Sequence, residues 1–386
     1  MNVFLKETAK ELGRCGVEVD IFTRSHDPHD PQVVELGENA RVIHLAAGPL
    51  AEPKHSLAQH LPSFTEALRS YVASHELRYD VVHGHYWLSG APALALAREQ
   101  GAPAIASFHT LARVQDLVRP SSGDAPERAE TEERIAREAD MLVSSSPQER
   151  EQLLRLYGPE PERCRVAPCG YDASIFRPMD QERARQALGL TAPYTVLFVG
   201  RMEKIKGIDI LLRAVGMLEE REKVYVLLVG GGEQDAERAT LAALARELGM
   251  DNRLRFTGRV AQEDLPVYYN AADVCVAPSY YETFGMVALE AMACGTPVIA
   301  ARAGGLQSTV QDGASGFLVP WHCPEPYAER LETVLGNAVL RRRLAAGAEA
   351  GAREKTWRFT ADRLLHAYEE ALARRRSDLA AAGARV

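Results

Sequence analysis

The chain has 386 residues, of which 46% are hydrophobic and 25% charged, and its formal net charge is -8. That length exceeds one ordinary core, so two domains are expected, and the acidic balance argues against broad nucleic-acid binding. No apolar run is long enough to span a membrane, and the charged, amphipathic first residues argue against a signal peptide. The six cysteines are scattered without a CxxC pair, so we expect reduced thiols in a cytoplasmic protein.

The chain opens on a helix that leads into a strand. Leu5, Ala9 and Leu12 recur at helical spacing, Gly13 and Gly16 punctuate, and "VEVDIF" alternates like a strand. Strand-like and helix-like runs then alternate. The strand-like runs are "VEVDIF", "RVIHLAA", "DVVHGH", "APAIASFH", "DMLVSSS", "CRVAPCG", "YTVLFVG", "VYVLLVGGG", "LRFTG", "DVCVAPS", "PVIAA" and "SGFLV".

Runs that are apolar on both faces are typical of parallel strands buried between helices. The pattern predicts an α/β protein of two doubly wound, Rossmann-like domains. The expected divisions are an N-terminal domain over 1–175, a C-terminal domain over 176–355, and a helix over 356–386 that returns to the first domain and ends in a frayed tail. The stretch "PCGYDASIFRPMDQERARQALGLTAP" is interpreted as an interdomain linker without a strand.

A basic loop follows the strand of "VLFVGRMEKIKGIDILLRAV". Arg201, Lys204 and Lys206 lie between the strand end at Gly200 and a helix expected from Ile208. Ligands of open α/β sheets bind beyond the carboxyl ends of the strands, and cations placed there suit a diphosphate. Taken alone, the segment is better explained as a solvated basic loop. It contains neither a GxxxxGK[ST] nor a GxGxxG motif.

A second strand end, in "APSYYETFGMVALEAMACGTPVIA", strengthens the diphosphate interpretation. A helix is expected from about Gly285 to Ala293, and its first amides, near Met286 and Val287, would form an anion site. Glu282 before the helix and Glu290 within it offer carboxylates that match vicinal diols. A charge favoured by the helix dipole and an exposed helix residue are the plainer alternatives. Glu290, however, stands in an apolar segment and needs a partner, which favours a nucleotide-sugar site.

The segments "GRMEKIKG" and "ETFGMVALEAMACGTPVIA" resemble the retaining glycosyltransferases of family 4, which have the GT-B fold. The resemblance implies a metal-independent hexosyltransferase that needs no cofactor beyond its co-substrate, a nucleoside diphosphate sugar such as a UDP-sugar. It implies catalytic roles for His109, Arg201, Lys206 and Glu282. The implied donor-binding residues are Arg201, Lys206, Arg259, Val260, Glu282, Phe284, Gly285, Met286, Val287 and Glu290. The absence of a D-x-D motif argues against the other common glycosyltransferase fold.

In its first half the chain resembles sucrose-phosphate synthases and, more closely, D-inositol-3-phosphate glycosyltransferases. That resemblance places His109 near the reacting sugar and a phosphorylated polyol or sugar acceptor at Lys54, Tyr86, Thr110 and Arg134. For Arg134, a helix-surface ion pair with Glu130 or Glu138 is the alternative. His83 and His85 share a strand face as metal ligands would, but a strand-end turn is preferred.

Other interpretations stay open. They include a lipid or polysaccharide acceptor, a nucleotide-sugar epimerase, and a binding protein without transferase activity. A homodimer and a peripheral membrane contact also stay open. In the related enzymes a strand and a Gly-Gly turn precede the first helix, so the chain as given is expected to lack its first strand. Asn2 would then be the N-cap of that helix at the acceptor site.

Overall fold

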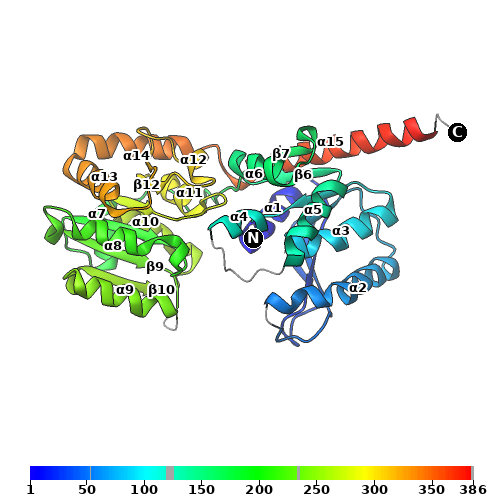
Figure 1. Cartoon of the computed structure of the whole chain (residues 1–386), viewed down its shortest axis with the longest axis horizontal. Coiled ribbons are helices and arrows are strands. Elements are labelled where there is room, and N and C mark those ends of the chain that lie inside the picture. Colours follow the sequence, from blue (N-terminus) through cyan, green and yellow to red (C-terminus); the bar gives the residue numbers. More distant parts are fainter. Residues whose placement is uncertain (53, 119–125, 233–234, 384–386) are drawn as a thin grey trace. The chain divides into compact units, whose positions relative to one another are not determined.

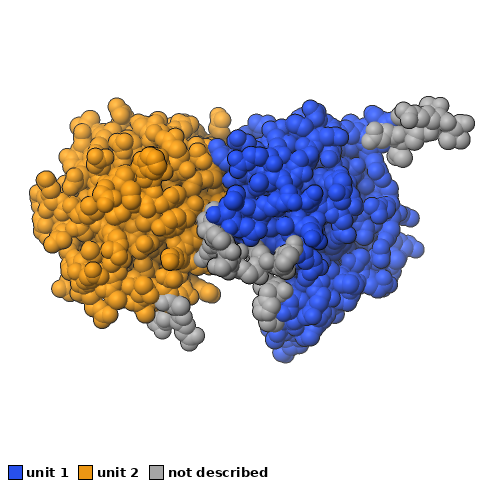
Figure 2. All heavy atoms as spheres, in the orientation of Figure 1, with its two compact units in different colours: residues 1–168, 357–386 blue, residues 169–356 orange. Residues whose placement is uncertain are grey.

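The computed structural model describes residues 1–52, 54–118, 126–232 and 235–383. The chain divides into two compact units, shown in different colours in Figure 2. Unit 1 contains Met1–Pro168 and Trp357–Val386, and unit 2 contains Cys169–Thr356. The chain therefore crosses between the units twice, and its C-terminal helix belongs to the same unit as its first residues.

Unit 2 is built on a parallel six-stranded sheet with the order β10-β9-β8-β11-β12-β13. Every residue of β11 and β12 is buried, as continuous apolar runs require. The order reverses between β8 and β11, so the loops after these two strands diverge at the switch point of a doubly wound sheet. The strands are β8 (Tyr194–Val199), β9 (Val224–Val229), β10 (Leu254–Gly258), β11 (Val274–Ala277), β12 (Val298–Ala301) and β13 (Gly316–Val319).

Helices cover both faces of this sheet (Figure 1), and apolar side chains from strands and helices form one core. Helix α7 lies within the stretch interpreted as a linker, and no strand of the described residues lies there, as expected. The helices are α7 (Gln181–Leu188), α8 (Ile208–Gly216), α9 (Ala236–Glu247), α10 (Leu265–Ala271), α11 (Met286–Ala293), α12 (Leu306–Thr309), α13 (Pro324–Gly336) and α14 (Ala338–Ala352). Short 3-10 turns are η3 (Lys204–Lys206), η4 (Arg221–Lys223), η5 (Asp251–Arg253) and η6 (Gln262–Asp264).

The strands of unit 1 form two sheets. One is parallel, with the order β4-β5-β6-β7; in the other, with the order β1-β3-β2, β3 pairs parallel with β1 and antiparallel with β2. Strand β2 was not expected from the sequence. The strands are β1 (Val19–Arg24), β2 (Val33–Gly37), β3 (Ala40–Leu45), β4 (Val82–His85), β5 (Ala104–Ser107), β6 (Met141–Ser144) and β7 (Cys164–Val166). A missing first strand stays a prediction.

In unit 1 the first helix of the chain packs against the last one. Helix α1 packs against α15, where the rings of Phe4 and Trp357 lie 6.0 Å apart. At the far end of α15, Arg374 donates to the carbonyl of Glu162. The helices are α1 (Asn2–Arg14), α2 (Leu61–Ser74), α3 (Trp87–Gln100), α4 (Ala112–Val118), α5 (Pro126–Glu138), α6 (Pro147–Tyr157) and α15 (Trp357–Gly383), with turns η1 (Lys54–His60) and η2 (Pro161–Arg163).

The tryptophan side chains of the two units differ in solvent exposure. Trp87 and Trp357 in unit 1 are buried, whereas Trp321 in unit 2 is 66% exposed. All six cysteines are free. Among the described residues, no helix is both long enough and apolar enough to cross a membrane.

Candidate active site

In unit 2 the loop after β8 packs against the loop after β11 and forms a backbone hydrogen bond with it. Gly207, which precedes α8, has a φ of 65°, and a Cβ there would lie 2.3 Å from the carbonyl oxygen of Pro278. The amide of Tyr280 donates to the carbonyl of Ile205 over 2.9 Å. The basic loop therefore lies directly against the loop that carries Glu282, at the switch point of the sheet.

Lys206 and Glu282 meet across these loops. The Lys206 Nζ donates to Glu282 Oε2 over 2.6 Å, and both side chains keep about a fifth to a quarter of their surface exposed. Arg201 instead pairs with Glu203 and is 75% exposed. In the described part of the chain no recorded contact joins Arg201 to Lys206 or Glu282. The sequence predicted that Arg201, Lys206 and Glu282 lie together. The structure brings Lys206 and Glu282 into contact, and Arg201 pairs with Glu203 instead.

A glycine pair fixes the backbone around Glu282. Gly304 has a φ of 46°, and a Cβ there would lie 1.8 Å from the carbonyl oxygen of Glu282. The amide of Gly305 donates to that same carbonyl over 2.9 Å, and its own Cβ position is 2.5 Å from Phe284 Cα. A side chain at Gly304 or Gly305 would overlap the backbone of Glu282–Phe284. The loop after β12 therefore packs directly against the loop after β11.

Helix α11 begins beside these two loops. Its N-cap, Gly285, has a φ of 91°, and no side chain caps the helix. The amides of Met286 and Val287 are the first of the helix, so no carbonyl of that helix can accept from them. Free amides at the positive end of a helix dipole are groups that bind anions in proteins, and these lie beside Glu282. Phe284 is buried, and its carbonyl accepts a hydrogen bond from the Thr309 hydroxyl over 3.0 Å.

Glu290 lies deeper, in the middle of α11. It is 7% exposed, and its Oε2 accepts a hydrogen bond of 2.8 Å from the hydroxyl of Tyr269 on α10. Burial raises the pKa of the Glu290 carboxyl to about 7, although the Tyr269 bond lowers it. The expected exposed-helix alternative is therefore wrong, and the partner of this buried carboxylate in the structure is a phenol.

Arg259 and Val260, two of the implied donor-binding residues, follow β10. The backbones of Gly200, Gly230 and Gly258 crowd together at the ends of three adjacent strands: Gly230 donates to Gly258, and a Cβ on Gly230 would lie 2.1 Å from the Gly200 oxygen. Arg259 and Val260 therefore begin at the same edge of the sheet as the basic loop, two strands away from it. Arg259 is exposed and Val260 is half-buried.

In unit 1, two residues with strained backbones follow adjacent strands. Tyr86, after β4, has φ 74° and ψ 156°, and His109, after β5, has a φ of 61°. Both conformations are costly for residues with a side chain, and such strain concentrates at functional sites. The amide of Tyr86 donates to the carbonyl of Ser107, which ties the two strand ends together.

Three histidine rings are stacked next to these strand ends. The rings of His83 and His85 lie 4.0 Å apart, and His85 Nδ1 lies 3.0 Å from His109 Nε2. His83 in turn contacts Ser107 and Tyr368. Burial lowers the pKa of His83 and of His109 to about 3 and that of His85 well below its ordinary value. These contacts hold the three rings within unit 1 at the ends of β4 and β5.

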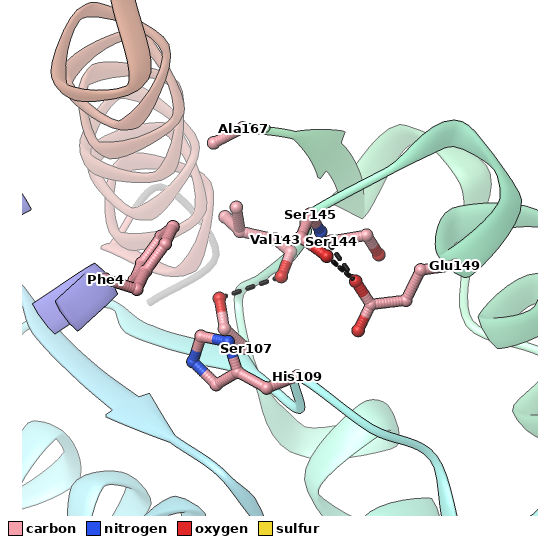
Figure 3. A pocket seen from close by; sticks show the side chains of 8 residues that line it. All are labelled: Phe4, Ser107, His109, Val143, Ser144, Ser145, Glu149 and Ala167. Carbon is pink, nitrogen blue, oxygen red and sulfur yellow. Dashed lines mark hydrogen bonds between the residues drawn. The ribbon is translucent and has the colours of Figure 1, made fainter. Parts of the chain in front are cut away.

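A small hollow adjoins this histidine stack. Figure 3 shows Phe4 and His109 on one side and Glu149 on another, with Ser107 and Ser145 between. Glu149 Oε2 accepts from both the amide and the hydroxyl of Ser145. Burial raises the pKa of the Glu149 carboxyl.

Tyr86 and Thr110, two of the residues expected at the acceptor, lie around the side chain of Arg128. Arg128 is 2% exposed and donates to the hydroxyl and carbonyl oxygens of Thr110, over 3.0 and 2.9 Å. Its guanidinium lies 5.0 Å from the centre of the Tyr86 ring and also bonds Glu132. Arg134, six residues further along α5, is exposed, and no ion pair with Glu130 or Glu138 is recorded in the described residues. The arginine whose side chain contacts Tyr86 and Thr110 is Arg128, and a contact between Arg134 and the acceptor stays a prediction.

Two other acceptor predictions have different outcomes. The N-cap of α1 is Met1, and Asn2 is the first residue of the helix and is exposed, so the expected capping role of Asn2 was wrong. Lys54 begins η1, but its side chain lies outside the described residues.

Two α/β units, one with a cation and helix amides at its switch point, define the GT-B class of glycosyltransferases. Residues 180–350 match the model of glycosyl transferases group 1, and residues 1–170 match that of the glycosyl transferase 4-like domain. The chain therefore belongs to glycosyltransferase family 4 and is a glycosyltransferase. This agrees with the resemblance seen in the motifs around Lys206 and Glu282.

Named relatives support this assignment. A D-inositol 3-phosphate glycosyltransferase from Thermomonospora curvata is 42% identical, over 95% of this chain and 90% of the relative. The solved sucrose-phosphate synthase from Thermosynechococcus elongatus has a TM-score of 0.88 and 36% identity, over 96% of this chain and 93% of that one. Anabaena HepE, solved in complex with UDP, has a TM-score of 0.75 at 21% identity, over 92% and 100% of the two chains, and so shows the fold alone.

Proposed function

We propose that this glycosyltransferase moves a hexosyl or N-acetylhexosaminyl group from a UDP-sugar to an acceptor, with retention at the anomeric carbon and without a metal ion. The observation that carries the donor side is the joined pair of loops at the sheet's switch point. There Lys206 and the first amides of α11 form a fixed positive site for a diphosphate. Such a site would stabilise the charge that develops on the leaving diphosphate.

The carboxylates of unit 2 would hold the sugars of the donor. Glu282 would contact the transferred sugar and Glu290 the ribose, because each can accept hydrogen bonds from a vicinal diol. Both carboxylates are then committed to the donor, so neither is available as a covalent nucleophile. The leaving phosphate would itself take the acceptor proton on the same face of the sugar. Arg201, Arg259 and Val260 remain proposed contacts of the diphosphate and the base.

For the acceptor, we propose a phosphorylated polyol or sugar. The support is the cluster in which the buried Arg128 guanidinium bonds the Thr110 hydroxyl and lies against the Tyr86 ring. Arginine binds phosphate oxygens through paired donors, so this cluster has the chemistry for a phosphate monoester. His109, at the neighbouring strand end, is proposed to contact the transferred sugar. The names of the relatives above, D-inositol 3-phosphate glycosyltransferase and sucrose-phosphate synthase, agree with such an acceptor.

One set of assays tests this function. The protein is incubated with UDP-N-acetylglucosamine or UDP-glucose, with and without EDTA, together with inositol phosphate or fructose 6-phosphate. The unphosphorylated polyol and sugar serve as controls. We expect a product only with a phosphorylated acceptor, in undiminished yield with EDTA, and NMR should show the anomeric configuration of the donor. Transfer to lipid or polysaccharide alone would contradict the acceptor, and an epimerised donor without acceptor would contradict transfer.

A further inference from the structure

We propose that Tyr269 is a positioning residue for donor binding, because its hydroxyl orients the Glu290 carboxylate toward the ribose diol of the nucleotide. This inference rests on the proposed function, in which Glu290 binds the ribose. Tyr269 itself would contact no substrate, because its side chain is completely buried. Its contribution would reach the donor through Glu290.

Tyr269 is held rigidly on α10. Its ring makes an edge contact with Phe176, with centroids 6.0 Å apart, and its carbonyl accepts from Thr296 over 2.7 Å. From this fixed base the hydroxyl reaches α11 and donates to Glu290 Oε2 over 2.8 Å. A donor held in this way fixes one carboxylate oxygen and, with it, the plane of the carboxylate.

Glu290 depends on this bond more than a surface carboxylate would. Its neighbours Leu289 and Ala291 are completely buried, and in the described residues the one hydrogen bond recorded for its carboxylate is that from Tyr269. The bond occupies one acceptor position on Oε2. Since an ionised carboxylate can accept about four hydrogen bonds, Oε1 and the second position on Oε2 remain for two ribose hydroxyls.

The titratable groups that face Glu290 provide no positive charge. They are the Tyr269 phenol on α10 and two thiols, Cys275 on β11 and Cys294 at the end of α11. Burial raises the pKa of each of these groups, so all three are neutral at pH 7. The ionised form of Glu290 is therefore stabilised by the phenol hydrogen bond rather than by a cation.

The variant Tyr269→Phe tests the inference, because it removes one hydroxyl and keeps the ring. Tyr327→Phe is its matched control: Tyr327 is also completely buried in unit 2, and its hydroxyl has no hydrogen-bond partner in the described residues. Calorimetry would measure binding of UDP and of 2′,3′-dideoxy-UDP, which lacks the diol. The ADP and GDP pairs are used instead if the wild type binds them more tightly. Circular dichroism would confirm that each variant is folded.

We expect Tyr269→Phe to weaken binding of the ribonucleotide about tenfold, or ~1.4 kcal/mol, and to leave the dideoxynucleotide within about twofold of wild type. Tyr327→Phe should change neither. The Tyr269 hydrogen bond lowers the Glu290 pKa, so its loss raises that pKa in Tyr269→Phe. As the pH falls, the variant should therefore lose ribonucleotide binding at a higher pH than the wild type does. Equal weakening of both nucleotides would show a merely structural role and overturn the inference.

Glu290→Gln separates this inference from the function on which it rests. If Glu290→Gln loses the preference for the ribonucleotide and Tyr269→Phe keeps it, positioning by Tyr269 is wrong and the ribose site stands. If Glu290→Gln keeps the preference, or if no nucleoside diphosphate binds the wild type, the proposed donor site is itself wrong, and the inference with it.

Discussion

Lys206 and Glu282, 76 residues apart in the chain, form a hydrogen-bonded ion pair of 2.6 Å between the loops that follow β8 and β11. Each is the other's partner before any donor arrives. The pair keeps both side chains at the switch point of the sheet, where a donor diphosphate and its sugar would share them. Pre-arranged charges of this kind need little reorganisation when the substrate binds.

Replacing Lys206 by alanine should therefore reduce kcat/KM for the donor by about 100-fold or more, or ~2.7 kcal/mol, since a charge aimed at the leaving group is lost. The matched control is Lys204→Ala, which removes an exposed lysine from the same turn. Steady-state kinetics with varied UDP-sugar would measure both. Equal losses in the two variants would mean that the loop acts only through its net charge.

Gly304→Ala should disturb Glu282 through the backbone. A Cβ at this position would lie 1.8 Å from the Glu282 carbonyl oxygen, so the loop after β11 must move. Gly313→Ala is the control, since Gly313 also has a positive φ, 75°, but has open space around its Cβ position. We expect Gly313→Ala to lower the free energy of unfolding by about 1 kcal/mol and to keep donor binding. Gly304→Ala should cost clearly more and weaken donor binding, and urea denaturation with calorimetry would show whether it does.

Glu290→Gln should stabilise the fold while it weakens the donor site. The folded-state pKa of Glu290, about 7, exceeds its ordinary value of 4.5, so ionisation of this group destabilises the folded protein as the pH rises from 4.5 to 7. Removing the charge should therefore raise the free energy of unfolding by about 3 kcal/mol at pH 8 and by almost nothing at pH 4, with the change falling between pH 4.5 and 7. Chemical denaturation of both proteins across this range measures the difference. A gain that did not depend on pH would contradict burial of the charge.

The two arginines of α5 should behave differently. Arg134→Ala should leave KM for a phosphorylated acceptor within about twofold of wild type, since its side chain is exposed and unpaired in the described residues. Arg128→Lys keeps the charge but loses the planar fork that bonds Thr110 and Glu132, so KM should rise about tenfold or more. Acceptor-dependent kinetics compare the two, with thermal melting as the check on folding. A larger effect from Arg134 would favour the sequence-based assignment of Arg134 instead.

The sequence predicted most strands because both of their faces are apolar, a pattern that only buried parallel strands need. It missed β2, whose five residues alternate between exposed and half-buried at an antiparallel edge. It also missed α7, an amphipathic helix between Asp180 and Gly189 that ends an otherwise irregular stretch. Both elements are short and only partly buried, so local composition outweighed their weak periodicity.

The donor motif could be read from the sequence because it depends on local backbone, namely glycines at strand ends and the first turn of α11. The acceptor cluster could not, because Tyr86, Thr110 and Arg128 come together only through the packing of three segments. One signal for Arg128 did exist. Arg128 and Glu132 stand four residues apart, and such a spacing joins them on the helix face that α5 turns inward. The identity of that inward face depended on tertiary packing.

The uneven exposure of the tryptophans gives each unit its own optical signal. Trp87 and Trp357 are buried in unit 1, and Trp321 is exposed in unit 2, on the chain that follows β13. Blue-shifted emission therefore reports on unit 1, whereas the emission that acrylamide quenches most readily comes from unit 2. Fluorescence can thus follow the melting of the two units separately in a single sample, without labels.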